Sequence, residues 1–163
     1  MTGIDIRLYE EGYFEDTCRL FHGVAQYYGT AKLPSEEHTR IYVRDQVLGK
    51  DSDVHIALAV ENKRAVGLVT FSIMYPSPDL KAQLYLKELY VHEGHRGKGA
   101  GRALMVFVAR YALAHGCNRM DWSAEKTNPT ALEFYRAVGA KPLAKKVYYR
   151  LADDELEAFA DKA

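Results

Sequence analysis

The sequence has 163 residues, with 22 Lys and Arg against 22 Asp and Glu, and 48% of its residues are hydrophobic. This composition excludes a disordered chain, and no apolar stretch approaches the roughly 20 residues of a membrane-spanning helix. Cys18 and Cys117 are the only cysteines, which excludes a disulfide-stapled scaffold and fits a reducing compartment. The first ten residues also lack the apolar core of a signal peptide. We therefore expect a single domain over residues 1–163, located in the cytoplasm.

The hydrophobic periodicity predicts alternating strands and helices along the chain. The expected strands are residues 4–9, 54–60, 65–75, 85–91, 119–123 and 147–151, and the expected helices are residues 12–28 and 35–48, segments starting near residues 99 and 128, and 153–160. The four residues 61–64 are typical of a tight hairpin turn between two strands. This order of elements indicates an α/β protein.

The stretch of residues 84–102 joins an extended apolar run to a cationic glycine loop and then to a helix. Apolar side chains recur at helical spacing after the loop, at Leu104, Phe107, Val108 and Tyr111. Gly99 and Gly101 therefore lie at a helix start, where unpaired backbone N–H groups and the helix dipole favour an anion. Arg96, Lys98 and Arg102 add positive charge. The sequence thus predicts a phosphate-binding loop.

The spacing of this loop distinguishes among known classes of phosphate site. A nucleotide P-loop requires Ser or Thr directly after its lysine, whereas Gly99 follows Lys98 here. A dinucleotide-binding loop requires a third glycine at the position that Arg102 occupies. Both classes are therefore disfavoured.

The run from Arg96 to Gly101 instead resembles the Arg/Gln-x-x-Gly-x-Gly/Ala pyrophosphate loop of the GNAT superfamily of N-acetyltransferases, which also follows a strand. The resemblance implies that acetyl-CoA binds here as co-substrate. It assigns cofactor contacts to the strand end and the loop: Leu89, Tyr90, Val91, Arg96, Gly97, Lys98, Gly99, Ala100, Gly101 and Arg102.

A second segment, residues 128–140, supports the same family. Asn128 is suited to cap a helix whose first residue is Pro129, and Gly139 is suited to end it. The segment resembles the GNAT helix that carries Asn-x-x-Ala-x-x-Phe-Tyr before a Gly-Ala turn. The resemblance implies that Asn128 and Tyr135 face the pantetheine arm and the sulfur of the cofactor.

The order of elements along nearly the whole chain matches the GNAT fold, a mixed and splayed central β-sheet flanked by helices on both faces. The layout of the C-terminal part resembles the spermidine/spermine (diamine) N-acetyltransferase branch, including the region of Trp122, the pair Phe134 and Tyr135, and the terminal helix. In that branch the catalytic glutamate falls at the position of Lys87, so this chain departs from the pattern.

Glu88 is the candidate general base, because an alkylammonium with a pKa of about 10.4 must lose its proton before it attacks. Strict alternation along the strand would place Glu88 on one face with Leu84, Leu86 and Tyr90, although a bulge would reverse that face. An apolar setting raises the pKa of a carboxyl group toward the range that a base needs. Glu88 is expected to take the proton, to relay it through water, or to bind the acceptor.

Tyr135 is the candidate general acid for the thiolate that leaves. A thiol pKa near 8.5 and a phenol pKa near 10 permit proton transfer between the two groups. The resemblance implies that a backbone N–H in the strand end at residues 89–91 stabilises the oxyanion, and that transfer is direct, without an acyl-enzyme.

We expect no metal site, because the run His92-Glu93-Gly94-His95 lacks the spacing of a zinc-binding His-Glu-x-x-His motif.

The charge distribution bears on the acceptor. Residues 1–61 hold 6 Lys and Arg against 11 Asp and Glu. The N-terminal part of the sequence is therefore acidic, and the rest of the sequence is basic. We expect a small, cationic, polyamine-like primary amine as acceptor, a homodimer, and neither nucleic-acid nor membrane partners. A protein lysine or N-terminus is an alternative acceptor, and aminoglycosides and amino acids also remain open. A non-catalytic acyl-CoA sensor is an alternative of another class. Acceptor specificity is expected from residues 26–34 and 75–80.

Overall fold

The computed structural model describes residues 3–29 and 31–162. The chain divides into two compact units, Met1–Ser123 and Ala124–Ala163. Thr30, which belongs to the expected acceptor loop, lies outside the described residues.

The first unit is built on a five-stranded sheet in the order β1-β2-β3-β4-β5. The strands are β1 (Asp5–Leu8), β2 (His55–Glu61), β3 (Arg64–Met74), β4 (Ala82–Val91) and β5 (Cys117–Asp121). The first four strands pair antiparallel, and β5 pairs parallel to β4. The sheet is therefore mixed, which confirms the expected fold class.

The hairpin between β2 and β3 forms where the sequence places it. Glu61 pairs directly with Arg64, and Asn62 and Lys63 between them have φ angles of 50° and 62°. Two central residues with positive φ are the geometry of the tight turns that match the twist of paired strands. The local turn sequence thus determines the register of this hairpin.

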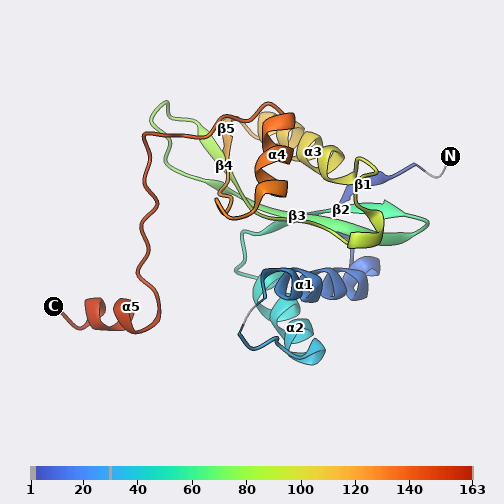
Figure 1. The fold of residues 1–163 in the computed structure, drawn as a ribbon, viewed down its shortest axis with the longest axis horizontal. Helices are drawn as coiled ribbons and strands as arrows, with labels where there is room; N and C mark the ends of the chain where they lie inside the picture. The colour runs from blue at the N-terminus through green and yellow to red at the C-terminus, as the bar shows by residue number, and fades with distance from the viewer. Residues whose placement is uncertain (1–2, 30, 163) are drawn as a thin grey trace. The chain divides into compact units, whose positions relative to one another are not determined.

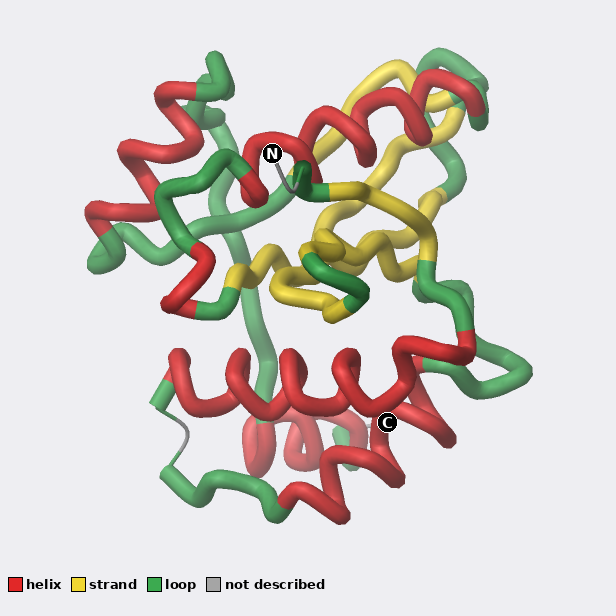
Figure 2. Tube along the Cα trace, turned by 90° about the vertical axis from the view of Figure 1, so that its right-hand side faces the viewer, coloured by secondary structure: helices red, strands yellow, loops and turns green. Residues whose placement is uncertain are grey.

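Helices cover both faces of the sheet (Figures 1 and 2). On one face lie α1 (Phe14–Tyr28) and α2 (Glu36–Tyr42), and α2 continues into a π-helical turn, Val43–Val47. Ser35 caps α2 by accepting a hydrogen bond from the backbone N–H of His38 at 3.1 Å. The core on this face is formed by Leu20, Val47, Ile56, Leu58, Val60, Ala65 and Leu68.

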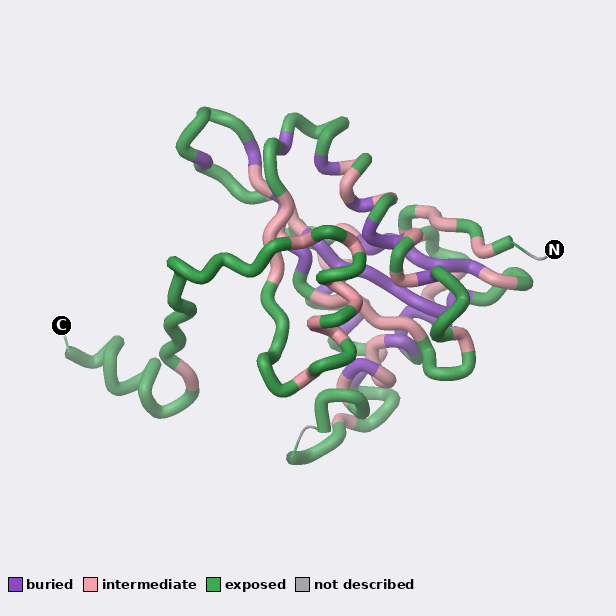
Figure 3. Tube along the Cα trace, turned by 45° about the horizontal axis from the view of Figure 1, so that its top comes forward, coloured by how far each residue is buried: buried purple, intermediate pink, exposed green. Residues whose placement is uncertain are grey.

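On the opposite face lies α3 (Ala100–Ala114), which buries Leu104, Met105 and Val108 against the sheet. Tyr111 of α3 packs edge-on against Phe71 of β3, with ring centroids 5.0 Å apart. The two faces of β3 therefore belong to different cores, with Phe71 facing α3 and Leu68 facing α1. Figure 3 shows that burial concentrates in the strands of this sheet.

The second unit contains α4 (Pro129–Ala137) and α5 (Asp153–Ala160). The terminal helix forms as expected, but the expected strand at residues 147–151 was wrong: this segment joins no ladder among the described strands. Its side chains are exposed, and Tyr149 keeps 87% of its accessible surface. β-branched and aromatic residues favour a strand only when a neighbouring strand supplies hydrogen-bond partners.

Candidate active site

The loop between β4 and α3 presents a run of unpaired backbone donors. Gly97 and Gly99 have φ angles of 74° and 88°, which only glycine adopts at little cost. The first helical bond of α3 runs from the N–H of Ala103 to the carbonyl of Gly99 at 3.0 Å. Within residues 3–29 and 31–162, no backbone hydrogen bond uses the N–H groups of residues 97–102. Such consecutive N–H groups at a helix start form an anion-binding concavity.

Side chains hold this loop in place. The Nδ1 of His95 lies 2.6 Å from Oε2 of Glu61, so the loop is tied to the hairpin between β2 and β3. The Nε of Arg96 donates to the carbonyl of Val91 at 2.8 Å. The ammonium of Lys98 donates to the carbonyl of Gly94 at 3.2 Å. The cations of Arg96 and Lys98 therefore help to shape the loop.

β4 and β5 separate beside this loop. β5 pairs with β4 over Ala82–Tyr85, whereas β3 pairs with β4 as far as Val91. In the described ladders the β5-facing edge of residues 86–91 consequently has no strand partner. This is the splay expected for the sheet, and Leu89, Tyr90 and Val91 lie along the open edge.

A β-bulge in β4 determines where Glu88 points. Phe71 pairs with Leu86, but the next residue of β3, Thr70, pairs with Glu88, so Lys87 is the extra residue. Residues paired across a sheet share a face. Leu86 thus shares the α3 face with Phe71, and Glu88 lies on the opposite face. The expectation that Glu88 shares a face with Leu84 and Leu86 was wrong because the bulge reverses the alternation; Tyr90, which pairs with Leu68, does share it.

Glu88 is partly buried, and its side chain keeps 21% of its accessible surface. Burial raises the pKa of this carboxyl above its ordinary value of 4.5, and the opposing effects of Lys87 and of a hydrogen bond with Tyr28 do not cancel the rise. The Nζ of Lys87 lies 3.6 Å from Glu88 Oε1 but is largely exposed, so solvent screens this ion pair. The backbone N–H of Glu88 donates to Oγ1 of Thr70 at 3.1 Å. A fixed carboxyl with a raised pKa is suited to accept a proton.

Tyr28 of α1 hydrogen-bonds Glu88, and ring contacts link Tyr28 to Tyr27 and Tyr27 to Tyr90 of β4. The guanidinium of Arg96 lies 5.3 Å from the ring centroid of Tyr27 and 5.7 Å from that of Tyr90. Tyr90 itself packs so tightly on α1 that a Cβ added at Gly23 would lie 2.6 Å from its hydroxyl. We call Tyr27, Tyr28, Glu88 and Tyr90 the acceptor-side cluster.

The sequence analysis did not assign Tyr27, Tyr28 or Tyr90 to a cluster with Glu88. A glycine inside a helical pattern signals close approach of a neighbour, and Gly23 is that signal here. It does not reveal which residue approaches, because Tyr90 is 67 positions away along the chain.

The remaining expected site residues, Asn128 and Tyr135, belong to the second unit. Asn128 caps α4, with its Oδ1 accepting a hydrogen bond from the backbone N–H of Ala131 at 3.1 Å. Gly139, with a φ of 88°, follows the end of this helix. The expected cap and helix end are confirmed. Tyr135 is partly buried, and its ring packs edge-on against Phe134 with centroids 5.3 Å apart.

Several carboxylates of the acidic N-terminal part are paired with arginines. Asp16 binds Arg19, Arg64 and the backbone N–H of Ala65. Further pairs join Glu15 to Arg40, Asp5 to Arg7, and Asp45 to Arg44. These carboxylates therefore support the fold.

Cys18 and Cys117 are buried, and burial raises the pKa of both thiols, which disfavours the nucleophilic thiolate.

The site geometry agrees with the relationships of the chain. Residues 19–140 match the model of the acetyltransferase (GNAT) family. Because this match spans more than half of the sequence, the chain belongs to that family, whose members are acyltransferase enzymes. A solved structure, an integron cassette protein from the mobile metagenome of V. cholerae, is 37% identical, with 99% of each chain covered and a TM-score of 0.92.

Several of the curated relatives are N-acetyltransferases. L-ornithine N5-acetyltransferase of Arabidopsis thaliana is 34% identical over 56% of this chain and 40% of that protein. Thialysine N-epsilon-acetyltransferase of Bos taurus is 31% identical over 49% and 47%, respectively. Spermidine/spermine N(1)-acetyltransferase-like protein 1 of Homo sapiens is 27% identical over 62% of this chain and 14% of that protein. The resemblance to the diamine acetyltransferase branch is confirmed, and the chain spans less than half the length of these relatives.

Proposed function

We propose that this protein transfers an acetyl group from acetyl-CoA directly to a primary amine of a small, cationic, polyamine-like acceptor. The observation that carries the proposal is the placement of Glu88: a partly buried carboxyl with a raised pKa, beside tyrosines, on a strand whose open edge leads into a phosphate-binding loop. No other part of the first unit, as far as it is described, combines these features.

The loop fits the cofactor. Its unpaired N–H groups at residues 97–102 and its two left-handed glycines would hold the pyrophosphate of acetyl-CoA. The open edge at Leu89–Val91 would offer backbone groups to the pantetheine arm and to the oxyanion. When bound, the cofactor supplies the acetyl group as a thioester.

Glu88 would remove the proton that the acceptor carries at neutral pH. An alkylammonium has a pKa of about 10.4, so a free amine is scarce without a base. The raised pKa of Glu88 makes its carboxylate a better acceptor of this proton. The hydrogen bond with Tyr28 orients the carboxylate. Glu88 acts either directly or through a water molecule.

Tyr135 would donate a proton to the thiolate that leaves. An ordinary phenol pKa of about 10 lies near an ordinary thiol pKa of about 8.5, so proton transfer between such groups has a small energetic cost. Asn128, seven positions earlier, would bind the pantetheine arm while its side chain also caps α4. Neither role requires a covalent intermediate with the protein.

The acceptor-side cluster favours a cation. Tyrosine faces attract an ammonium group, and a carboxylate adds a charge-assisted hydrogen bond. Several N-terminal carboxylates are already paired with arginine, and the rings of Tyr27 and Tyr90 already face the guanidinium of Arg96. We therefore assign the attraction mainly to Glu88. The names of three relatives point the same way, since ornithine, thialysine and spermidine each carry more than one amino group.

The test is acetyl-CoA turnover, measured by thiol release, with spermidine, a simple monoamine and a lysine peptide at two salt concentrations. We expect spermidine to give the highest kcat/KM, and its KM to rise more with salt than that of the monoamine, because the Debye length falls from about 10 Å at 0.1 M to about 3 Å at 1 M. A preference for the peptide would identify a protein acetyltransferase. Acetyl-CoA binding without turnover on any amine would identify a sensor.

A further inference from the structure

The side chain of Arg96 contacts both α1 and β4. Its guanidinium lies 5.3 Å from the ring centroid of Tyr27 on α1 and 5.7 Å from that of Tyr90 on β4. Its Nε also donates to the carbonyl of Val91, at the end of β4, over 2.8 Å. One planar cation thus joins three parts of the first unit: the glycine loop, the last turn of α1 and the end of β4.

A chain of contacts leads from this guanidinium to Glu88. Tyr27 packs edge-on against Tyr28, with ring centroids 5.5 Å apart, and Tyr28 hydrogen-bonds the carboxylate of Glu88. Tyr27 also lies edge-on to Tyr90, with centroids 6.5 Å apart. Two tyrosines therefore separate the guanidinium from the proposed general base.

The two tyrosines at the end of α1 are only half covered by the rest of the protein. Tyr27 keeps 49% of its accessible surface and Tyr28 keeps 58%, so core packing fixes these rings only in part. A guanidinium stacks as a rigid plane on an aromatic face, and its N–H groups remain free to bind a carbonyl at the edge. Arg96 has this arrangement, and it therefore fixes Tyr27 relative to the end of β4.

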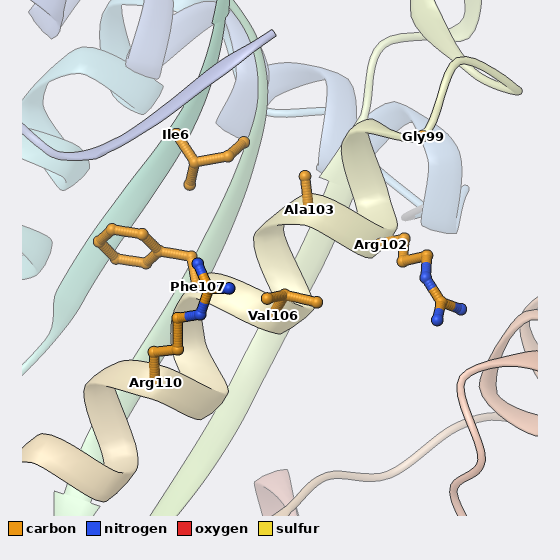
Figure 4. Close-up of a pocket in the computed structure, with 7 residues that line it drawn as sticks. All are labelled: Ile6, Gly99, Arg102, Ala103, Val106, Phe107 and Arg110. Atoms are coloured by element: carbon orange, nitrogen blue, oxygen red, sulfur yellow. The ribbon is translucent and has the colours of Figure 1, made fainter.

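The proposed phosphate contacts do not require the guanidinium of Arg96. Those contacts are the backbone N–H groups of residues 97–102, whereas the N–H of Arg96 donates to the carbonyl of Glu93 at 3.2 Å. Arg102, another cation of this segment, lines a groove that runs along α3 from Gly99 (Figure 4). α3 covers the opposite face of the sheet from α1 (Figures 1 and 2). The two arginines thus lie in different settings, and only Arg96 contacts the acceptor-side cluster.

We infer that Arg96 is a positioning residue for the amine acceptor. Its guanidinium holds the last turn of α1 against the end of β4, so that Tyr28 orients the Glu88 carboxylate toward the amine. The inference rests on the proposed function, and it assigns this guanidinium to the amine side of the reaction instead of to the phosphates. Its specific content is that loss of the guanidinium lowers kcat/KM for the amine and leaves acetyl-CoA affinity nearly unchanged.

The experiment compares Arg96→Gln with the unmodified protein, by calorimetry with acetyl-CoA and by kinetics with spermidine at saturating acetyl-CoA. We expect kcat/KM for spermidine to fall about tenfold, the scale of an exposed cation–π contact together with a hydrogen bond. Acetyl-CoA affinity should stay within a factor of about two. Arg96→Lys keeps the charge but not the planar stack, so it should show the same loss.

The matched control is Arg44→Gln. Arg44 is an exposed arginine of the first unit that pairs with the adjacent Asp45. This variant should change neither kcat/KM nor acetyl-CoA affinity.

A double-mutant cycle tests whether Arg96 acts through Tyr27. Tyr27→Phe keeps the aromatic face and should have a higher kcat/KM than Tyr27→Leu, which removes the face and should lose about tenfold. Combining Arg96→Gln with Tyr27→Leu should reduce kcat/KM no further than either single variant, because both substitutions remove the same contact. A general loss of stability would instead give additive losses and no difference between Phe and Leu.

Thermal unfolding followed by circular dichroism checks that each variant is folded, as expected for substitutions at exposed side chains. A fall of about tenfold or more in acetyl-CoA affinity of folded Arg96→Gln would show that the guanidinium binds the phosphates. That result, or additive losses in the cycle, overturns the inference while the proposed function stands. If the unmodified protein acetylates no amine, the proposed function fails and the inference fails with it.

Discussion

The two halves of the candidate site in the first unit are formed by different kinds of group, backbone amides in one and side chains in the other. The proposed cofactor half, residues 97–102, consists of backbone N–H groups and glycines with positive φ. The proposed acceptor half consists of side chains from α1 and β4, including Glu88 and its hydrogen-bond partner Tyr28. A backbone site depends on local conformation, whereas a side-chain site depends on which face each strand residue takes. The cofactor half should therefore be sensitive to added atoms, and the acceptor half to removed functional groups.

Gly99→Val should produce the largest effect, because it adds a β-branched side chain at a φ of 88°. The Cβ itself meets no atom within 4 Å, so the backbone conformation alone carries the cost of about 1–3 kcal/mol. The loop must change its shape to relieve this strain, and its N–H groups then no longer converge. We expect calorimetry to detect no acetyl-CoA binding by a protein that remains folded.

Gly94→Ala is the matched control for this variant. Gly94 lies in the same loop, but it lacks a positive φ, and an added Cβ would lie 3.8 Å from its nearest neighbour, His92 Nδ1. Its acetyl-CoA affinity should stay within a factor of about two, as for most exposed substitutions. Undiminished affinity in folded Gly99→Val would refute the role of the loop.

Glu88→Gln tests the acceptor half, because it removes a proton acceptor and leaves the size of the side chain nearly unchanged. We expect kcat/KM to fall by about 10²–10⁴, the usual contribution of a general base. In the unmodified protein, kcat/KM should fall as pH drops through the raised pKa of Glu88, at a pH above 4.5. Glutamine does not titrate, so this acidic limb should disappear from the pH profile.

Acetyl-CoA affinity should be unchanged in Glu88→Gln, which separates the two halves. Glu157→Gln on the exposed surface of α5 is the control and should keep the full pH profile. If the acidic limb persists in Glu88→Gln, the base is a water molecule or another side chain.

Tyr135→Phe examines whether the second unit contributes chemistry. We expect turnover to fall by about 10²-fold with little change in acetyl-CoA affinity, since only the donated proton is lost. Phe134→Leu, at the adjacent ring, should instead affect stability more than turnover, because Phe134 offers packing alone. A rate in Tyr135→Phe equal to that of the unmodified protein would leave Tyr135 as a packing residue.

Gly23→Ala should give the smallest effect, confined to the acceptor half. The new Cβ would lie 2.6 Å from the Tyr90 hydroxyl, so the ring must move and disturb the acceptor-side cluster. We expect the KM of the amine to rise about tenfold, from an overpacking cost of about 1–3 kcal/mol, and the KM of acetyl-CoA to stay constant. Gly12→Ala, whose Cβ meets nothing within 4 Å, should change neither constant.

The elements that form locally were predictable from sequence. The hairpin at Asn62 and Lys63, the cap at Asn128 and the helix end at Gly139 each follow from the conformational preferences of a few adjacent residues. The glycine loop at residues 97–102 belongs to the same class, because glycine spacing before a helix specifies its conformation. For this reason the family and the conformation of this loop could be inferred before any fold was known, whereas phosphate binding by the loop stays a prediction.

Tertiary structure decided the acceptor half. The bulge at Lys87 leaves no clear mark in the sequence, because it arises from the pairing of β4 with β3, yet it reverses the face on which Glu88 lies. The contact between Gly23 and Tyr90 and the exposure of residues 147–151 likewise depend on partners distant in the chain. Local conformation is determined by neighbouring residues, whereas strand register and the faces it creates are determined by long-range pairing.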